Sequence, residues 1–337
     1  MQAASSLLIL ISCAMLSACR APAIVNDLDT YRHRLANVLN QTFVKIEPTV
    51  SLRFPPASQL RVSIPSTNIS MRDFYALNEC HVSTLIAQRN TALGKVQLPS
   101  VRLVYEYQLI FGLETCLAST SEQEQQQRRQ LQQWIAQKKK HYPLVWADLI
   151  QNSSEFKNTL SSNQSLLSNV KPAELQEYKQ ALNYLISLSR GEAAVPERVE
   201  KSLDSLRSNP LLAKLWRSQR LVTEHLTDIN EKLARAEKQL TCSSSQSKQQ
   251  VSYLKNVFSS YFVDRIQPFA SNMNQVHYTL SPIIIELMQR PELSAAFQLY
   301  LSNNLQQFQN YQQALQAHIE FWQSLFDSCG LSPQKSI

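Results

Sequence analysis

The chain has 337 residues with only four glycines, and its formal net charge at pH 7 is +7. Phosphate-binding loops, dinucleotide-binding turns and the nucleophile elbow of hydrolases need closely spaced glycines, a pattern that this sequence lacks. The composition therefore argues against nucleotide-dependent chemistry. The positive charge favours polyanionic partners, such as acidic lipid headgroups or cell-wall polymers, although it can equally serve solubility alone.

A short apolar run from Leu7 to Leu16 is followed by the small residues Ser17 and Ala18 and by Cys19. About ten apolar residues are too few to span the roughly 30 Å of bilayer hydrocarbon. A short apolar core before small residues is typical of a cleaved secretory signal, although Met1 to Ser6 lacks the usual Lys or Arg. An ordinary signal peptide with an incidental cysteine is the alternative interpretation.

The segment Leu16-Ser17-Ala18-Cys19 resembles the lipobox of bacterial lipoproteins. The resemblance implies that residues 1–18 are a signal peptide and that Cys19 becomes the lipidated, palmitate-bearing first residue of the mature protein. In that class an acidic residue after the cysteine usually means retention in the inner membrane, so Arg20 implies the periplasmic face of the outer membrane. Two or more acyl chains supply a stable anchor, and the membrane is therefore an expected partner.

Four cysteines remain in such a mature chain: Cys80, Cys116, Cys242 and Cys329. In an oxidising compartment they indicate two disulfides, for which three pairings exist. Neither a CxxC nor a Cys–His spacing suggests a metal site instead.

The first predicted helix covers residues 24–46, where apolar residues recur mostly on one side. The helical pattern stops at residues 49–65, because Pro55-Pro56 and Pro65 fix φ and bias the preceding residues toward extended backbone. We therefore predict an extended strap at 49–65 that lies along the helices. A ligand-docking segment is the alternative.

Two further helical segments, 71–92 and 100–118, are separated by a turn. The part from Val101 to Leu117 is apolar nearly all round, which predicts a buried helix. An antiparallel hairpin of the two segments would bring Cys80 and Cys116 to the same end. We therefore expect these two cysteines to form a disulfide.

Four short motifs precede Cys116: Asn78-Glu79-Cys80, Leu85-Ile86-Ala87-Gln88-Arg89-Asn90, Leu93-Gly94-Lys95-Val96 and Arg102-Leu103-Val104-Tyr105-Glu106. This region resembles the signature of an uncharacterised lipoprotein family of Gram-negative bacteria. The order and total length of the chain also fit that family. The resemblance supports the lipobox and the cysteines, and it implies no chemistry.

A Gln-rich helix is predicted from Ser121 to about Lys140, because Ser121 to Glu124 has the capping-box spacing. Gly191 follows a predicted helix end and suits a left-handed C-cap. Prolines at the favoured first position begin four more predicted helices: Pro143, Pro172, Pro196 and Pro210.

The Ser- and Asn-rich segment 152–169 is the predicted boundary between an N-terminal helical half, 19–160, and a C-terminal half, 161–337. One continuous domain is the alternative.

Two long helices with heptad-like seams are predicted in the second half. The first seam consists of Leu215, Gln219, Val222, Leu226, Ile229, Leu233, Ala236 and Leu240. The second helix runs from Pro291 to Ser328, and its seam consists of Leu301, Leu305, Phe308, Tyr311, Leu315, Ile319, Trp322 and Phe326. A Cys242–Cys329 disulfide would make the two helices parallel, with residues 246–290 returning between them in a path that Pro268 and Pro282 break.

None of the six histidines pairs with another His, Cys or acid at metal-ligand spacing, so we expect neither a metal nor another cofactor. One candidate polar cluster is predicted at the hairpin, with the members Glu79, His81, Arg89, Asn90 and Glu106. Such a cluster can fix the register of the hairpin as a structural network. The alternative is acid–base chemistry in a wall hydrolase, with Glu106 or His81 at its centre.

The sequence thus predicts an all-α fold, an elongated multi-helix bundle with two long heptad-like helices and two disulfides. The predicted function is that of a non-catalytic cell-envelope lipoprotein that presents helical surfaces to an envelope protein or an anionic cell-wall partner, with no nucleic acid as a partner. The alternatives are a periplasmic enzyme acting on a cell-wall polymer and a carrier of a small ligand.

Overall fold

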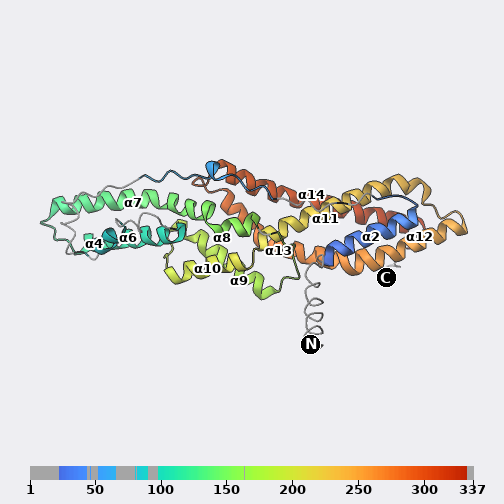
Figure 1. Ribbon diagram of the computed structural model, residues 1–337, viewed down its shortest axis with the longest axis horizontal. Helices are drawn as coiled ribbons and strands as arrows, with labels where there is room; N and C mark the ends of the chain where they lie inside the picture. Colours follow the sequence, from blue (N-terminus) through green and yellow to red (C-terminus); the bar gives the residue numbers. More distant parts are fainter. Residues whose placement is uncertain are drawn as a thin grey trace, which may run out of the picture. The chain divides into compact units, whose positions relative to one another are not determined.

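The computed structural model of the protein describes residues 23–43, 46, 52–65, 80, 82–89, 98–162 and 164–331. Helices supply all regular secondary structure in these residues, none of which lies in a β-strand (Figure 1). The predicted all-α class is therefore confirmed. Within the same residues, no helix combines the length and the apolar character needed to cross a membrane. The expected lipidation site, Cys19, lies outside the described residues.

The packing divides the chain into two compact units, each built from segments that are distant in sequence. Unit 1 takes the described parts of Met1–Pro48, Leu221–Asn272 and Tyr311–Ile337. Unit 2 takes those of Thr49–Arg220 and Met273–Asn310. The boundary predicted near residue 160 falls inside unit 2.

Unit 1 is a helical bundle in which α2 (Ala23–Leu39) packs against α12 (Ser245–Val257) and the π-helix η5 (Phe258–Ile266). The remaining helical segments are residues 221–236 of α11 (Leu211–Ala236), the short η4 (Glu237–Gln239), residues 267–272 of α13 (Gln267–Met288) and residues 311–328 of α14 (Ala295–Ser328).

Helix α2 ends at Leu39, earlier than the predicted residue 46. Asn40 adopts a left-handed φ of 49°, and the Gln41 N–H donates to the Ala36 carbonyl oxygen at 3.0 Å. This is the geometry of a helix C-cap, in which Asn replaces the more usual glycine. The early end is therefore a local effect of Asn40.

The Cys242–Cys329 disulfide is present, as expected, and its Cα atoms are 5.5 Å apart. In unit 1 the Asn230 side chain donates to the Ala314 carbonyl oxygen at 2.9 Å. Asn230 lies twelve residues before Cys242, and Ala314 lies fifteen residues before Cys329. From this hydrogen bond to the disulfide, the sequence therefore runs in the same direction along both helices. Helices α11 and α14 are parallel here, as predicted.

All eight residues of the predicted α11 seam are buried. The α14 seam is partly wrong, because Leu305, Leu315 and Ile319 are only half-buried. The buried line of α14 instead passes through Asn304, Ala314 and His318. Both polar members are hydrogen-bonded to side chains of α11, Asn304 to Arg220 within unit 2 and His318 to Asn230 within unit 1. Such bonds make their burial possible.

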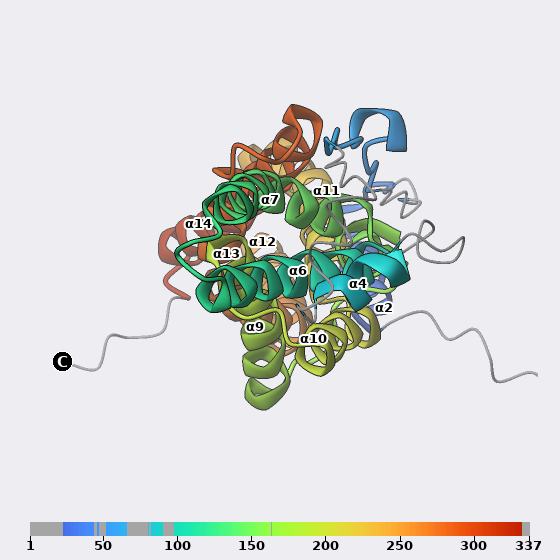
Figure 2. The ribbon, with the colours of Figure 1, turned by 90° about the vertical axis from the view of Figure 1, so that its left-hand side faces the viewer.

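In unit 2, α4 (Val82–Arg89), α6 (Pro99–Ser119) and α7 (Gln125–Asn152) pack together, with α6 and α7 side by side in Figures 1 and 2. The predicted Cys80–Cys116 disulfide is present, with Cα atoms 5.6 Å apart. A shared apolar core joins the three helices, and its buried residues are Val82, Ile86, Leu109, Leu113, Cys116, Leu131, Trp134 and Ile135.

Two prolines lie inside helices where breaks were predicted. Pro143 stands within α7, and Pro282 within α13. A proline removes one hydrogen bond of the helical ladder and disturbs the preceding turn. In α7 the buried neighbours Tyr142, Val145 and Trp146 pack into the interior on one face, which offsets that loss. The predicted break at Pro268 is also absent, because η5 and α13 are continuous in helix there.

The remaining helices of unit 2 are α8 (Ser154–Lys157), the π-helix η2 (Asn158–Ser162), α9 (Pro172–Ser187), η3 (Leu188–Arg190) and α10 (Pro196–Ser208), together with residues 211–220 of α11, 273–288 of α13 and 295–310 of α14. Pro172 and Pro196 occupy first helical positions, as predicted. Pro210 directly precedes α11.

Residues 52–65 contain no α-helix, only the 3-10 turn η1 (Ala57–Gln59). The buried side chains of Leu52 and Leu60 face the interior. The ring of Phe54 lies edge-on to that of Tyr300, with centroids 5.2 Å apart, and the Asn152 amide donates to the Leu60 carbonyl oxygen at 3.1 Å. This segment is thus packed against α7 and α14 within unit 2.

Candidate functional site

Of the predicted polar cluster, Arg89 and Glu106 lie in the described residues, whereas Glu79, His81 and Asn90 lie outside them. The Arg89 guanidinium stands 6.0 Å from the centroid of the Tyr105 ring. Burial, with a further contribution from the Glu106 charge, raises the pKa of Tyr105 to about 12. Glu106 itself faces α7.

The carboxylate of Glu106 accepts two hydrogen bonds from Lys138 Nζ, at 2.8 and 3.2 Å. Both side chains are largely buried, with 10% and 13% of their surface exposed. A buried charge needs such a partner, because desolvation penalises an isolated one. Lys138 is the first of three consecutive lysines, 138–140, and nothing in that run predicts a pairing with Glu106. Of the described members, Arg89 thus contacts the Tyr105 ring of α6 and Glu106 pairs with Lys138 of α7, and both contacts are structural.

Helix α6 is not buried all round, which corrects the prediction for Val101 to Leu117. Val101 is 46% exposed and Phe111 is 63% exposed. Leu98, which directly precedes the helix, is 70% exposed. Val104 is half-buried, and Gln108 and Thr115 are exposed. These positions recur at steps of three or four residues, which places them on one side of the helix. We call the set Leu98, Val101, Val104, Gln108, Phe111 and Thr115 the α6 face.

A groove of about 410 Å³ lies beside the α6 face, and it is lined by Tyr107, Ile110, Phe111, Glu114, Lys139, Tyr142, Pro143, Ser189 and Gly191. Its mouth carries an ion pair between Lys139 and Glu114, at 2.6 Å. Burial raises the pKa of Tyr142, and the Tyr142 hydroxyl has no hydrogen-bond partner among the described residues.

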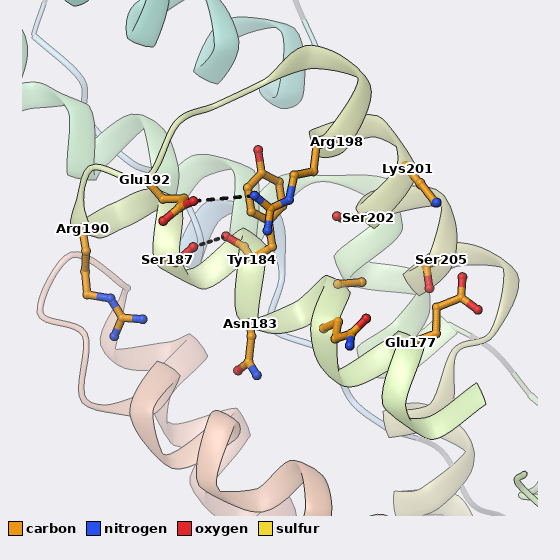
Figure 3. Close-up of a pocket in the computed structure, with 12 residues that line it drawn as sticks. Glu177, Asn183, Tyr184, Ser187, Arg190, Glu192, Arg198, Lys201, Ser202 and Ser205 are labelled. Carbon is orange, nitrogen blue, oxygen red and sulfur yellow. Dashed lines mark hydrogen bonds and ion pairs between the residues drawn. The ribbon is translucent and has the colours of Figure 1, made fainter. Parts of the chain in front are cut away.

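A larger groove of about 760 Å³ lies between α9 and α10 (Figure 3). Its lining is almost entirely polar and consists of Glu177, Gln180, Ala181, Asn183, Tyr184, Ser187, Arg190, Glu192, Arg198, Lys201, Ser202 and Ser205. The guanidinium of Arg198 stacks over the Tyr184 ring at 3.8 Å and pairs with Glu192 at 3.6 Å. We call this the α9–α10 groove.

The turn that closes the α9–α10 groove is held from several sides. Gly191 has a left-handed φ of 92° and caps η3, as predicted. The buried Tyr184 hydroxyl donates to the Ala193 carbonyl oxygen at 2.8 Å and accepts from the Val195 N–H at 3.2 Å. Burial raises the pKa of Tyr184, so the hydroxyl keeps its proton for the first of these bonds.

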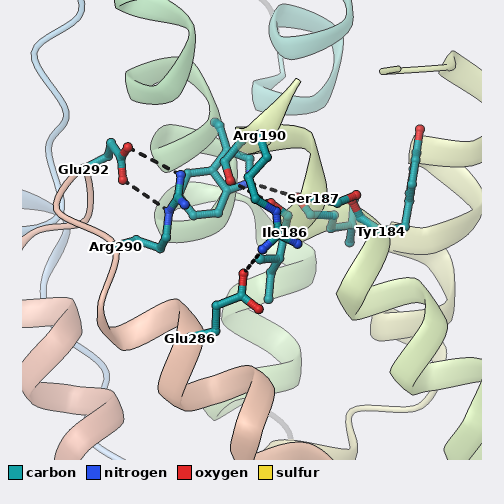
Figure 4. A network of polar contacts seen from close by, with 10 residues as sticks. Tyr184, Ile186, Ser187, Arg190, Glu286, Arg290 and Glu292 are labelled. Carbon is teal, nitrogen blue, oxygen red and sulfur yellow. Dashed lines mark hydrogen bonds and ion pairs between the residues drawn. The ribbon is translucent and has the colours of Figure 1, made fainter. Parts of the chain in front are cut away.

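Figure 4 shows the other side of this turn, where Arg190 forms an ion pair with Glu286 of α13 at 2.5 Å. Nearby, Arg290 pairs with Glu292 at 3.4 Å and lies 5.2 Å from the centroid of the Trp146 ring. The Trp146 indole N–H donates to the Leu185 carbonyl oxygen at 2.8 Å. These contacts fix the end of α9 to its neighbours within unit 2.

Unit 1 contains a buried network around His318. The Trp322 indole N–H donates to His318 Nε2 at 3.1 Å, and the Tyr31 hydroxyl lies 2.9 Å from the same nitrogen. Because Nε2 is an acceptor, Nδ1 carries the hydrogen and donates it to Asn230 Oδ1 at 2.8 Å. Burial lowers the pKa of His318 to about 3, so the ring is neutral at pH 7.

The described residues contain no group of three or more His, Cys, Asp or Glu side chains that could hold a metal ion. Sequence reasoning missed the α9–α10 groove entirely. Its polar residues recur at helical spacing on α9 and α10, a pattern that is also typical of an ordinary solvated helix face.

Comparison with known proteins places the chain in a family. Neither the curated proteins nor the solved structures contain a significant match to the chain. The model of the family described as proteins of unknown function, DUF3080, matches residues 28–333, a span that includes both units and both disulfides. The chain therefore belongs to the DUF3080 family.

Proposed function

We propose that the protein is a non-catalytic cell-envelope lipoprotein, anchored through Cys19 at the periplasmic face of the outer membrane, that presents the α6 face to a protein partner. The lipobox-like segment at Leu16–Cys19 supports the anchor. The observation that carries the docking role is the exposure of Val101 and Phe111 on α6 and of Leu98 at its N-cap.

The spacing of the α6 face favours an amphipathic helix as the docking element. Its positions recur at steps of three or four residues, the spacing at which the side chains of one helix interlock with those of another. Several exposed apolar side chains on one side of a helix can form an interaction site. The opposite side of α6 is fixed by the core it shares with α4 and α7 and by the Cys80–Cys116 disulfide. A rigid support of this kind lowers the entropic cost of docking.

The position of Glu106 supports a non-catalytic role over the wall-hydrolase alternative. A general acid must come within hydrogen-bond reach of its substrate. The Glu106 carboxylate is instead occupied by Lys138, and both side chains are largely buried.

Site-specific photo-cross-linking tests the docking role. A photoreactive amino acid at Phe111 should give one dominant protein adduct in intact envelopes. The matched control is the same amino acid at Tyr253 of α12, which is 53% exposed. The variant Phe111→Ser should lower recovery of the partner, and because the side chain is exposed the variant should still fold. The same set of adducts at both positions, or none at Phe111, would contradict the docking role.

The anchor is tested separately. Replacing Cys19 with Ser should release the protein from membranes into the soluble fraction, because lipid attachment needs the thiol. Tight membrane association of this variant would contradict lipid anchoring, whatever the result at Phe111.

A further inference from the structure

We propose that the α9–α10 groove binds a carboxylate-bearing glycopeptide, a polymer segment in which N-acetylated amino sugars carry short acidic peptides. The choice of this ligand rests on the proposed location in the cell envelope, where such polymers occur. It does not rest on the α6 face or on any partner of that face.

The size of the groove suits such a segment. Its volume of about 760 Å³ lies within the range of roughly 300–1,000 Å³ that is usual for ligand sites. Both helices contribute small side chains to the lining, Ala181 from α9 and Ser202 and Ser205 from α10, and these leave the groove open. Larger residues at these positions would fill the space between the two helices.

The residue types of the lining favour a polar ligand. Ala181 and Tyr184 are its only apolar residues, and the Tyr184 ring is covered by the guanidinium of Arg198. The other side chains offer amides, hydroxyls and charges, including those of Gln180, Asn183 and Ser205. A matching ligand is rich in hydroxyl and amide groups, as an N-acetylated sugar is.

The charges of the lining are compatible with a ligand that carries carboxylates beside neutral groups. The lining contains three cations, Arg190, Arg198 and Lys201, and two carboxylates, Glu177 and Glu192. Arg190 and Arg198 have carboxylate partners, whereas the exposed Lys201 forms no ion pair with any described residue. Lys201 is therefore available for a carboxylate of the ligand, as a compact point charge.

The two carboxylates of the lining disfavour a uniformly charged polyanion. A nucleic acid or a highly sulfated glycan would place like charges beside Glu177 and Glu192, which costs binding energy. A ligand that alternates carboxylates with neutral sugar and amide groups avoids this repulsion. This pattern of charge is that of a glycopeptide.

The groove is also preorganised. Arg198 is stacked on Tyr184, and the Tyr184 hydroxyl holds both sides of the turn through Ala193 and Val195. Arg190 is tied to α13 through Glu286. Little side-chain ordering is then required when a ligand enters, which favours affinity.

Titration calorimetry tests the proposal. The full chain with Cys19→Ser is titrated with a disaccharide–tetrapeptide that carries free carboxylates and, separately, with a neutral N-acetylglucosamine oligomer of similar sugar length. The disaccharide–tetrapeptide should bind, and the neutral oligomer should bind at least tenfold more weakly, since one charge-assisted contact is worth roughly that factor. The free tetrapeptide, titrated in the same way, shows whether the sugars contribute. If it binds as tightly as the disaccharide–tetrapeptide, the groove recognises the peptide alone.

Two variants of the groove and one control sharpen the test. Lys201→Glu should weaken binding of the disaccharide–tetrapeptide about tenfold or more, because it replaces attraction by repulsion. Ser205→Leu should weaken it by filling the groove without a change in charge. Lys238→Glu makes the same change of charge at an exposed site in unit 1 and should leave binding within about twofold. Circular dichroism establishes that each variant is folded.

Three results would overturn the proposal: no binding of the disaccharide–tetrapeptide at millimolar concentration, equal binding of the neutral oligomer, or equal losses for Lys201→Glu and Lys238→Glu. The last of these would indicate attraction by net charge alone. If the binding test fails while the Cys19→Ser variant leaves the membrane and Phe111 gives its cross-link, the glycopeptide site is refuted and the proposed function stands.

Discussion

The buried His318 network of unit 1 and the open groove of unit 2 use polar side chains in different ways. In unit 1, both ring nitrogens of the buried His318 are hydrogen-bonded, through Asn230, Tyr31 and Trp322. In unit 2, the buried hydroxyl of Tyr142 has no partner among the described residues, and polar side chains line an open groove between α9 and α10. The polar groups around His318 therefore specify internal packing in unit 1. Unit 2 keeps polar and apolar groups available for contact with other molecules, which makes it the unit in which we expect function.

The largest expected effect is that of His318→Ala. The substitution removes the shared partner of Tyr31, Trp322 and Asn230 and leaves a cavity. We expect the free energy of unfolding of unit 1 to fall by about 5 kcal/mol. Urea unfolding measures it, with the exposed His33→Ala as the control, which should stay within about 0.5 kcal/mol. Equal losses for the two variants would contradict the structural role of His318.

The second effect distinguishes the units by pH. Burial lowers the pKa of His318 to about 3 and that of His225 to about 4 in unit 1, and that of His277 to about 4 in unit 2, all from an ordinary value of 6.5. Because the unfolded chain takes up protons first, the stabilisation is complete above pH 6.5 and is lost as pH falls toward these values. Each histidine contributes up to about 1.4 kcal/mol per pH unit.

Between pH 7 and pH 5 we therefore expect unit 1 to lose about 4 kcal/mol of stability and unit 2 about 2 kcal/mol from these histidines. Hydrogen exchange with mass spectrometry, corrected for the intrinsic pH dependence of exchange, resolves the two units. Equal protection of unit 1 peptides at both pH values would show that these histidines do not control its stability.

The third effect concerns the Glu106–Lys138 pair in unit 2. Lys138→Met leaves the largely buried Glu106 carboxylate without its cation, so we expect a loss of about 3 kcal/mol in the free energy of unfolding. The double variant that also carries Glu106→Gln should regain part of this free energy, because the unpaired carboxylate is gone. The exposed neighbour Lys140 supplies the control, because Lys140→Met should cost less than about 0.5 kcal/mol. A similar cost for both single variants would mean that the pair is not structural.

The smallest effect concerns the turn beside the α9–α10 groove. Gly191 has a φ of 92° with open space where a Cβ would lie, so Gly191→Ala meets only backbone strain. We expect a loss of about 1 kcal/mol. Gly191→Asn should cost less, since Asn tolerates left-handed backbone better. Thermal unfolding compares them, and the reverse order would indicate that strain at Gly191 is not the cause.

Periodicity predicted much of the fold because it follows burial where the buried residues are apolar. The α11 seam is one example. The Cys242–Cys329 pair is another, since cysteines that follow the ends of two helices come together when those helices pack. The same reasoning failed at α6, where an apolar composition predicted full burial. Val101 and Phe111 are exposed because α4 and α7 cover only part of the helix within the described residues.

The candidate site was less predictable. Of the predicted cluster, Glu106 finds its partner in Lys138, which lies 32 residues along the chain, and no local pattern marks that pair. The groove depends on small residues of α9 and α10 that meet only after the two helices pack.

By itself, the sequence determined the all-helical class, the buried side of α11 and the left-handed turn at Gly191, because each depends on residues within a few turns of one another. Only the tertiary structure decided which line of α14 is buried. His318 lies there because Asn230 and Tyr31, 88 and 287 residues away in sequence, meet its ring nitrogens. Hydrophobic periodicity predicts burial only where apolar side chains leave water. It cannot predict the burial of a polar group, because that depends on hydrogen-bond partners that folding brings together.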